Sequence, residues 1–308
     1  MLEKKYKGKI SENYIKISTK GGKVSSKKVS NSKDTILTVL VTAYNHEETI
    51  SKCLDSILEQ QTVYNFEIWL LEDDSTDGTY EICKKYALEN PGLIKLVHQT
   101  KNTMGYHASF IRRNVTSRYL TVLEADDWWC DNNKIQTALN LLEEKPEYIT
   151  FAHDTLYVNH VDGTKKSLVH DILKQNISNP VSLEDAPYLH TSARIHRNVI
   201  PPMIRGDIII YYSYLDSGLL YYHDKVMSVY NITGKGAWSG LNKKQQTQRF
   251  NRSQYRLNKL FNYKYDKYFS NKVSSPKKLQ QYKFFFGKKF GWTVYILNER
   301  MKFLDEKN

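Results

Sequence analysis

Short runs of apolar residues, many of them β-branched, recur between residues 36 and 124. They read ILTVLVT, FEIWLL, LIKLVH and YLTVL, and they start near residues 36, 66, 93 and 119. Runs of this kind are typical of buried strands, and a repeat of about 26–30 residues leaves room for one helix between successive strands. The pattern therefore predicts a mostly parallel sheet built from βαβ units.

Apolar residues at helical spacing fill the segments between these strands. Asn45 and Glu48 precede the first set, and their spacing is typical of a capping box at a helix start. Four helices are predicted, around Ile50, Cys53, Leu54, Ile57 and Leu58; Ile82, Cys83, Tyr86 and Ala87; Ala108, Ile111 and Val115; and Ile135, Ala138, Leu139 and Leu142. The alternation predicts a doubly wound, Rossmann-like α/β fold, which binds ligands at the carboxyl ends of its strands.

The positive charge of the chain is concentrated at its two ends. The net charge is +12, but residues 1–33 carry +8 and residues 241–308 carry +13, so residues 34–240 carry −9. The acidic middle segment argues against nucleic acid as the ligand of the core. Residues 1–33 are rich in Lys, Ser and Gly, and we expect a flexible arm with one short strand near Tyr14–Ile17.

The cysteines and the apolar segments indicate the cellular compartment in which the protein is expected. Cys53, Cys83 and Cys130 are odd in number and form no C-x-x-C pair, so neither a disulfide framework nor a zinc knuckle is predicted. The first residues lack the apolar core of a signal peptide, and no stretch reaches the roughly 18–20 apolar residues of a spanning helix. We therefore expect a cytoplasmic protein.

Polar motifs follow three of the predicted strands. They read TAYNHEET, EDDSTDGT and EADDWW. The third places Glu124, Asp126 and Asp127 within four residues, where like charges repel one another unless a cation is bound or solvent is near. On an extended chain Glu124 and Asp126 point to the same side. Such oxygen ligands are typical of Mg²⁺ or Mn²⁺, which would bridge to the phosphates of a substrate.

The remaining phosphate-binding signals are weak. Ser75, Thr76 and Asp77 in the second motif are residue types that usually make turns and helix caps. Neither a G-x-G-x-x-G fingerprint nor a P-loop follows the first strand, so no glycine-rich loop accounts for phosphate binding. The metal would have to supply the positive charge.

The order of the motifs resembles that of family 2 glycosyltransferases with the A-type fold. TAYNHEETI, D-D-S-T-D-G-T, N-x-x-G at Asn102–Gly105 and E-A-D-D follow one another as in that family, and the similarity covers about residues 36–240. We accordingly expect a catalytic domain at 34–240, with a nucleotide-binding half at 34–130 and an acceptor-binding half at 131–240.

The resemblance implies roles in nucleotide binding. Thr42 and Tyr44 would line the base and ribose pocket. Asp73 would accept a hydrogen bond from the nucleobase imide, which favours uracil and hence a UDP-sugar donor. Glu72 stands where the family usually has Asp.

The resemblance also implies a metal site of the D-x-D type. Asp126 would be the principal metal ligand, while Glu124 and Asp127 would contact the donor ribose, the sugar or the metal shell. Glu124 again replaces an Asp of the family pattern.

The second half of the domain resembles the same family in HTSARIHR, RGDIII and VMSVYNITGKGAWSG. Asp207 would be the general base that takes a proton from the acceptor hydroxyl, and direct displacement would invert the anomeric centre. A helix N-cap is the alternative role for Asp207. Trp238 could stack on a sugar or simply pack. His190 could bind phosphate or acceptor, or be a packed side chain.

The extension at 241–308 combines Lys and Arg with aromatic residues. Phe250, Leu257, Leu260 and Phe261 form a partial apolar stripe, which predicts a basic amphipathic helix. Such a helix can lie on an anionic membrane, pack on the catalytic domain, or bind single-stranded nucleic acid. We favour the membrane over packing, and packing over nucleic acid.

These predictions combine into an inverting glycosyltransferase that uses Mn²⁺ or Mg²⁺. It would move a sugar from a UDP-sugar to a glycan or lipid-linked acceptor in surface polysaccharide or glycolipid synthesis. One alternative is a nucleotide-sugar-binding protein without turnover, for which Glu124 in place of Asp is the supporting feature. The other is a nucleic-acid binder that acts through its basic tails, with an affinity that falls steeply with salt.

Overall fold

The computed structural model describes residues 14–20, 23–25, 34–103, 112, 114–199, 206–234, 236 and 238–265. The helix predicted around Ala108 and Ile111 lies outside the described residues. The chain divides into two compact units, Met1–Gln246 and Thr247–Asn308, and each is described by itself.

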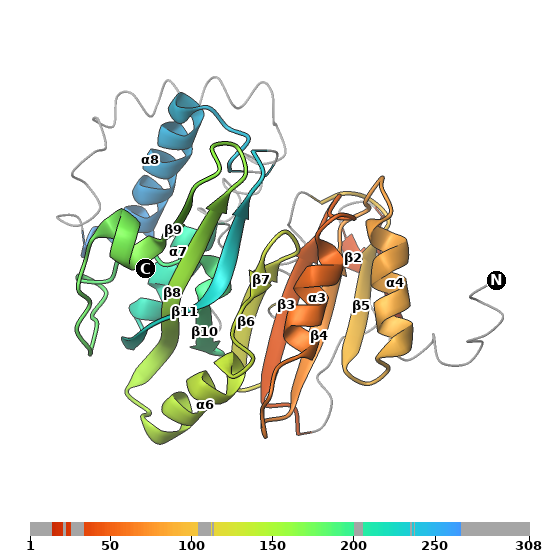
Figure 1. Ribbon diagram of the computed structural model, residues 1–308, viewed down its shortest axis with the longest axis horizontal. Helices are drawn as coiled ribbons and strands as arrows, with labels where there is room; N and C mark the ends of the chain where they lie inside the picture. The colour runs from red at the N-terminus through yellow and green to blue at the C-terminus, as the bar shows by residue number, and fades with distance from the viewer. Residues whose placement is uncertain are drawn as a thin grey trace. The chain divides into compact units, whose positions relative to one another are not determined.

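A parallel sheet forms the first half of the larger unit. Its strands stand in the order β5-β4-β3-β6, and neighbouring strands are parallel (Figure 1). The ranges are β3 (Leu37–Ala43), β4 (Phe66–Glu72), β5 (Ile94–Gln99) and β6 (Tyr119–Glu124). This is the doubly wound order, so the predicted fold class is confirmed.

The strand expected near the N-terminus is longer than predicted and belongs to this sheet. It is β1 (Tyr14–Lys20), which lies parallel to β5, while β2 (Lys23–Ser25) pairs with β1 in the antiparallel direction. Part of the predicted arm is therefore regular structure.

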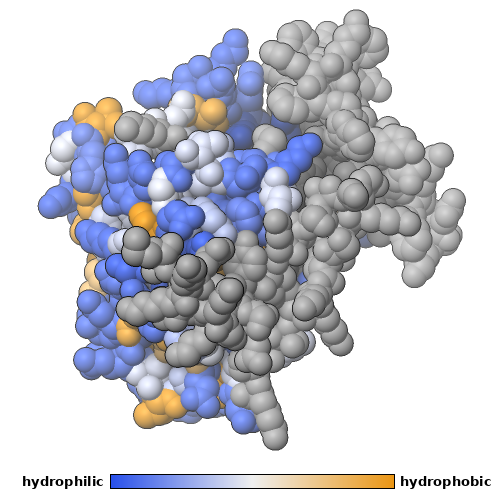
Figure 2. All heavy atoms as spheres, turned by 90° about the vertical axis from the view of Figure 1, so that its right-hand side faces the viewer, coloured by the Kyte–Doolittle hydropathy of each residue, from blue (hydrophilic) through white to orange (hydrophobic). Residues whose placement is uncertain are grey.

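Three helices pack into one core with this sheet. They are α3 (Ile50–Leu58), α4 (Thr79–Glu89) and α6 (Lys134–Glu144), and their buried residues pack with alternate strand residues such as Val39 and Ile68. Successive residues of a strand point to opposite faces of the sheet, so Leu40 and Trp69 belong to a second buried cluster. The described surface on the α4 side is mostly hydrophilic, with small separate apolar spots (Figure 2).

The start of α3 differs from the prediction. Its N-cap residue is Thr49, whose side chain makes no capping hydrogen bond. Asn45 instead has a left-handed backbone conformation (φ 56°), and its side-chain oxygen accepts a hydrogen bond from the backbone N–H of Thr76 at 2.8 Å. The predicted capping box is wrong because this side chain is bound to the turn after the neighbouring strand.

The second half of the sheet is mixed. β10 (Arg194–Arg197) is antiparallel to both β6 and β8 (Tyr148–Asn159), and β11 (Leu219–Ile232) is parallel to β8. β7 (Trp128–Trp129) pairs antiparallel with β11 at the edge, and β9 (Lys165–Ser167) pairs with β8.

A short connection forces this half of the sheet to curl. Residues 125–127 alone join β6 to β7, although three strands separate these two in the sheet order. A link of this length spans at most about 14 Å. The end of β11 is therefore drawn back to the end of β6.

The remaining elements are mostly short. They are a helical turn at Leu168–Leu173, the 3-10 turn η2 (Thr191–Ala193) and α7 (Asp207–Leu215), followed by the longer α8 (Lys243–Leu260). Among the described segments, none of the helices has the length and apolar character needed to cross a membrane.

Candidate metal and nucleotide-sugar site

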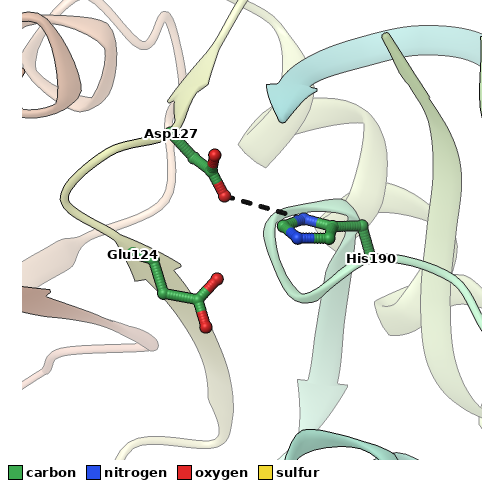
Figure 3. A group of neighbouring side chains, drawn as sticks. All are labelled: Glu124, Asp127 and His190. Carbon is green, nitrogen blue, oxygen red and sulfur yellow. Dashed lines mark ion pairs between the residues drawn. The ribbon is translucent and has the colours of Figure 1, made fainter. Parts of the chain in front are cut away.

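The acidic motif lies at the carboxyl end of β6, where the sheet changes from parallel to mixed pairing. Glu124 is the last residue of β6 and pairs in register with Thr42 near the end of β3. The backbone turns at once, because the N–H of Asp127 donates to the carbonyl of Glu124 at 2.9 Å. The extended geometry expected from Glu124 to Asp126 is therefore wrong, and it is Glu124 and Asp127 that come together (Figure 3).

His190 joins these two carboxylates from the other half of the domain. One oxygen of Glu124, one oxygen of Asp127 and one ring nitrogen of His190 all lie within 4.8 Å of one another (Figure 3). Asp127 Oδ2 is 3.7 Å from His190 Nδ1. His190 caps η2, and the N–H of Ser192 donates to its Nδ1 at 3.3 Å. The turn thus holds the imidazole beside the carboxylates.

Asp127 is the member of this group that most needs a cation. Its side chain is fully buried, and Oδ1 accepts a hydrogen bond from the N–H of Asn231 at 3.0 Å. Oδ2 has no hydrogen-bond partner within the described part of the chain. Burial raises the pKa of Asp127 well above its ordinary value, and the nearby charges of Glu124 and Asp126 raise it further. A divalent cation would relieve both the repulsion and the missing contact.

The pKa values of the other two members, Glu124 and His190, are shifted in opposite directions. Burial, together with the charges of Asp126 and Asp207, raises the pKa of Glu124 to about 8, while Arg194 opposes this shift. Burial and Arg194 lower the pKa of His190 to about 3, so its imidazole is neutral at pH 7. Neutral imidazole is the form that binds metals. Two carboxylates and one imidazole can therefore hold a divalent cation.

Asp126 lies beside this group but is not one of its members. Its Oδ2 is 4.0 Å from His46 Nε2. A Cβ atom placed on Gly236 would lie 3.8 Å from the same oxygen, so the loop after β11 reaches the acidic motif. The assignment of Asp126 as the principal metal ligand stays a prediction.

The residues predicted to bind the nucleotide lie at the ends of β3 and β4. Asp73, which is buried, accepts two hydrogen bonds at Oδ1 from Thr103, one from N–H (2.8 Å) and one from Oγ1 (2.9 Å). Thr42 is half-buried, and Tyr44 is 42% exposed. The three are thus placed at one edge of the sheet, and their contacts with a nucleotide remain predictions.

The second polar motif forms a structural turn. Ser75 Oγ accepts from the N–H of Asn45 (3.0 Å), and Asp77 Oδ2 accepts from the N–H of Glu47 (3.2 Å). Glu72 Oε1 accepts from the N–H of Ser75 (2.7 Å). These bonds tie together the turns that follow β3 and β4, which supports the structural interpretation of the motif.

Asp207 is the first residue of α7, and it is exposed. The N-cap residue is Gly206, whose φ of 113° suits glycine, so the N-cap role for Asp207 is wrong. Tyr188 donates a hydrogen bond from its hydroxyl to Asp207 Oδ2. The charge of Asp207 raises the pKa of both Glu124 and His190, so the predicted base acts electrostatically on the metal group.

Trp238 lies in the turn after β11 and is 40% exposed. Its carbonyl accepts a hydrogen bond from Gln246 Nε2 at 3.2 Å. The indole is therefore accessible to a ligand, and its stacking role remains a prediction.

The sequence does not identify His190 as a metal ligand. This histidine begins the motif HTSARIHR, but nothing in the spacing of the motifs links it to Asp127. That link depends on the curl of the sheet, which is not a local property of the sequence.

Proteins related in sequence match the part of the chain that contains the parallel sheet and the acidic motif. The family described as glycosyl transferase family 2 matches residues 38–196, which is more than half of the chain. The uncharacterized protein Rv1520 of Mycobacterium tuberculosis is 31% identical over 133 residues, covering 42% of this chain and 38% of that protein. Glycosyltransferase GlyG of Streptococcus pneumoniae is 30% identical over 111 residues, 36% of each chain.

A further relative has a more specific name. It is UDP-Glc:alpha-D-GlcNAc-diphosphoundecaprenol beta-1,3-glucosyltransferase WfaP of Escherichia coli, 26% identical over 123 residues, or 40% of this chain and 47% of that protein. The matched region spans less than half the length of each of these three relatives.

Solved structures share the fold at low sequence identity. Mannosyltransferase PcManGT from Pyrobaculum calidifontis, in complex with GDP-Man and Mn²⁺, is 20% identical with a TM-score of 0.54, covering 71% of this chain and 63% of that chain. TarS 1–349 of Staphylococcus aureus, in complex with UDP, is 17% identical with a TM-score of 0.50, covering 80% and 78%. The family match and this shared A-type fold agree with the doubly wound sheet. The chain belongs to glycosyl transferase family 2.

Proposed function

We propose that the protein is an inverting, divalent-metal-dependent glycosyltransferase that moves a sugar from a UDP-sugar to a glycan or lipid-linked acceptor. The observation that carries the proposal is the group of Glu124, Asp127 and His190 at the carboxyl end of β6. It occupies the position at which a doubly wound sheet binds its ligands. A relative named for UDP-Glc and a diphosphoundecaprenol acceptor supports this choice of donor and acceptor.

Glu124, Asp127 and His190 would hold Mn²⁺ or Mg²⁺, and the imidazole favours Mn²⁺ because Mg²⁺ prefers oxygen ligands alone. When bound, the ion would neutralise the charge on the diphosphate leaving group. Asp207 accepts the proton of the acceptor hydroxyl while that oxygen attacks C1 of the sugar. The bond from C1 to the diphosphate breaks on the opposite face, which inverts the anomeric centre.

The remaining predicted residues position the substrates. Thr42, Tyr44 and Asp73 would hold the uridine at the ends of β3 and β4. Asp126, which lies beside this group, would bind the same ion, as the family resemblance implies. Trp238 would cover a sugar ring from the loop that reaches Asp126.

We also propose that α8 docks on an anionic membrane surface at the cytoplasmic face. Arg249, Arg252, Arg256 and Lys259 recur three or four residues apart, which places them on one side of the helix. The helix sequence KKQQTQRFNRSQYRLNKL contains no acidic residue. A basic stripe of this kind would bring the enzyme to a lipid-linked acceptor in surface polysaccharide or glycolipid synthesis.

The test is release of UDP or GDP from a panel of UDP-sugars and GDP-mannose, with Mn²⁺, Mg²⁺ or EDTA. Metal-dependent release from one UDP-sugar, reduced at least 100-fold in Asp127→Asn and in Asp207→Asn, supports the proposal. Asp162→Asn in the exposed β8–β9 turn is the matched control and should keep full activity. Donor binding without turnover would favour the inactive binding protein, and release from GDP-mannose alone would overturn the choice of UDP.

A further inference from the structure

The carboxylate of Asp207 is held by a side chain from another segment. Tyr188 donates the hydrogen bond from its phenol hydroxyl to Oδ2 of Asp207. Tyr188 lies two residues before His190, in the segment that leads into η2. The predicted base and the histidine of the metal group are therefore joined through one short stretch of chain.

Two tyrosines of α7 also donate hydrogen bonds to the segment that contains Tyr188. Tyr211 donates to the carbonyl of Pro187 at 2.9 Å, and Tyr212 donates to the carbonyl of Ala186 at 3.2 Å. These two bonds end on backbone carbonyls and hold the helix in place. The bond from Tyr188 differs because it ends on an exposed carboxylate.

Arg194 fixes the ring of Tyr188. Arg194 is 3% exposed, and its guanidinium carbon lies 5.5 Å from the ring centre of Tyr188 and 4.6 Å from that of Tyr211. The two rings meet edge to face at 5.8 Å. Arg194 Nε also donates to the carbonyl of His190 at 3.2 Å. A ring packed on a buried cation in this way has little freedom to rotate.

We propose that Tyr188 is a positioning residue for the proton transfer, because its hydroxyl holds Oδ2 of Asp207 and leaves Oδ1 to receive the proton of the acceptor hydroxyl. The inference rests on the proposed function, in which Asp207 is the base. The proton moves from the acceptor oxygen to Oδ1, and the bond from Tyr188 to Oδ2 is kept throughout.

The first experiment compares Tyr188→Phe with Tyr212→Phe in transfer from the UDP-sugar that the wild type uses. Loss of a hydrogen bond to a charged group should lower kcat about tenfold or more in Tyr188→Phe. KM for the donor and the affinity for Mn²⁺ should stay within about twofold, because Tyr188 touches neither in this scheme. Tyr212→Phe loses a hydroxyl from the same contact zone and should keep kcat within about twofold.

A double-variant cycle separates positioning from a purely structural role. In Asp207→Glu the carboxylate is already displaced, so adding Tyr188→Phe should change kcat less than about twofold. If Tyr188→Phe lowers kcat by the same factor in both backgrounds, it acts independently of Asp207 and the inference is overturned. A wild-type kcat in Tyr188→Phe would overturn it as well.

The outcomes distinguish this inference from the proposed function. If Asp207→Asn is nearly inactive while Tyr188→Phe behaves like the wild type, only the role of Tyr188 fails. If Asp207→Asn keeps full activity, the assignment of the base fails, and the role of Tyr188 falls with it. Binding of Mn²⁺ by each variant shows that the fold around the site is intact.

Discussion

Asp127 Oδ2 and His190 Nδ1 face each other at 3.7 Å. The distance is too long for a hydrogen bond, and within the described residues nothing else donates to Asp127 Oδ2. His190 Nδ1 instead contacts Ser192, whose N–H donates to it at 3.3 Å and whose Oγ lies at 2.9 Å, so the imidazole is held beside Asp127 without bonding to it. This relationship distinguishes the group from a cluster of surface acids.

Replacing Asp127 by Asn should have opposite effects with and without metal. In EDTA the buried carboxyl of the wild type must either stay charged without a partner or take up a proton on folding, and Asn avoids both, so the free energy of unfolding at pH 7 should rise by about 1–3 kcal/mol. In excess Mn²⁺ the wild type should gain stability that Asp127→Asn lacks. Thermal unfolding in EDTA and in Mn²⁺ measures both effects.

Asp162→Asn is the control for that experiment and should respond to Mn²⁺ as the wild type does. An equal gain from Mn²⁺ in Asp127→Asn would show that the ion binds elsewhere.

The raised pKa of Glu124 predicts how the stability of the metal-free protein depends on pH. At a folded-state pKa of about 8, the folded protein holds a proton that the unfolded chain has already released. Stability in EDTA should therefore fall as the pH rises from 6.5 to 8, by up to about 2 kcal/mol. His190 opposes this fall near pH 6.5, where the imidazole is still half-protonated in the unfolded chain but neutral in the fold, and it contributes almost nothing near pH 8.

Glu124→Gln should reduce this fall, to which Asp127 also contributes through its raised pKa, and saturating Mn²⁺ should abolish the fall in the wild type, because the ion favours the charged carboxylates. Denaturant unfolding at pH 6.5, 7.25 and 8 provides the measurement. A fall of equal size in Glu124→Gln would assign it to another group.

Glu72 and His98 form a buried pair that holds the turn after β4. Glu72 Oε2 lies 2.5 Å from His98 Nδ1, and the Glu72 side chain is fully buried. Burial alone would raise the pKa of Glu72, but hydrogen bonds from His98 and Ser75 lower it below its ordinary value. Its stabilising effect is therefore present above the unfolded-state pKa of about 4.3 and lost as the pH falls through the lower folded-state pKa.

Glu72→Gln should cost about 2–4 kcal/mol of unfolding free energy at pH 7, since it breaks a buried pair. The matched control is Glu81→Gln, which removes an exposed i,i+3 contact to Lys84 of 4.0 Å and should cost less than about 0.5 kcal/mol. Urea denaturation at pH 7 separates the two predictions. Equal, small losses would mean that the Glu72 pair contributes little.

The stripe on α8 should carry the affinity for an anionic membrane. Each cation near the surface contributes about 1 kcal/mol, so replacing Arg249, Arg252, Arg256 and Lys259 by Gln in the full chain should weaken vesicle binding at least 100-fold. Lys243→Gln with Lys244→Gln removes two cations outside the stripe and should have a smaller effect per charge. Co-sedimentation with phosphatidylserine vesicles, and with neutral vesicles as reference, measures the loss. Unchanged binding by the stripe variant would contradict membrane docking through α8.

Local periodicity along the chain is enough to predict the strands of the parallel sheet. The runs at 36, 66, 93 and 119 became β3 to β6, because strand alternation and βαβ spacing are written within a few dozen residues. The crowding of Glu124, Asp126 and Asp127 was equally visible, since these residues are neighbours along the chain. The repulsion among these carboxylates indicates a cation without any knowledge of the fold.

Tertiary structure alone decided which groups meet. The three-residue link from β6 to β7 curls the sheet, and the end of β11 then supplies the N–H of Asn231 to Asp127 while His190 arrives from η2. Because of the same long-range packing, the side chain of Asn45 accepts a hydrogen bond from Thr76 and does not cap a helix. Contacts between distant segments depend on strand order and register, and no local spacing in the sequence encodes either of them.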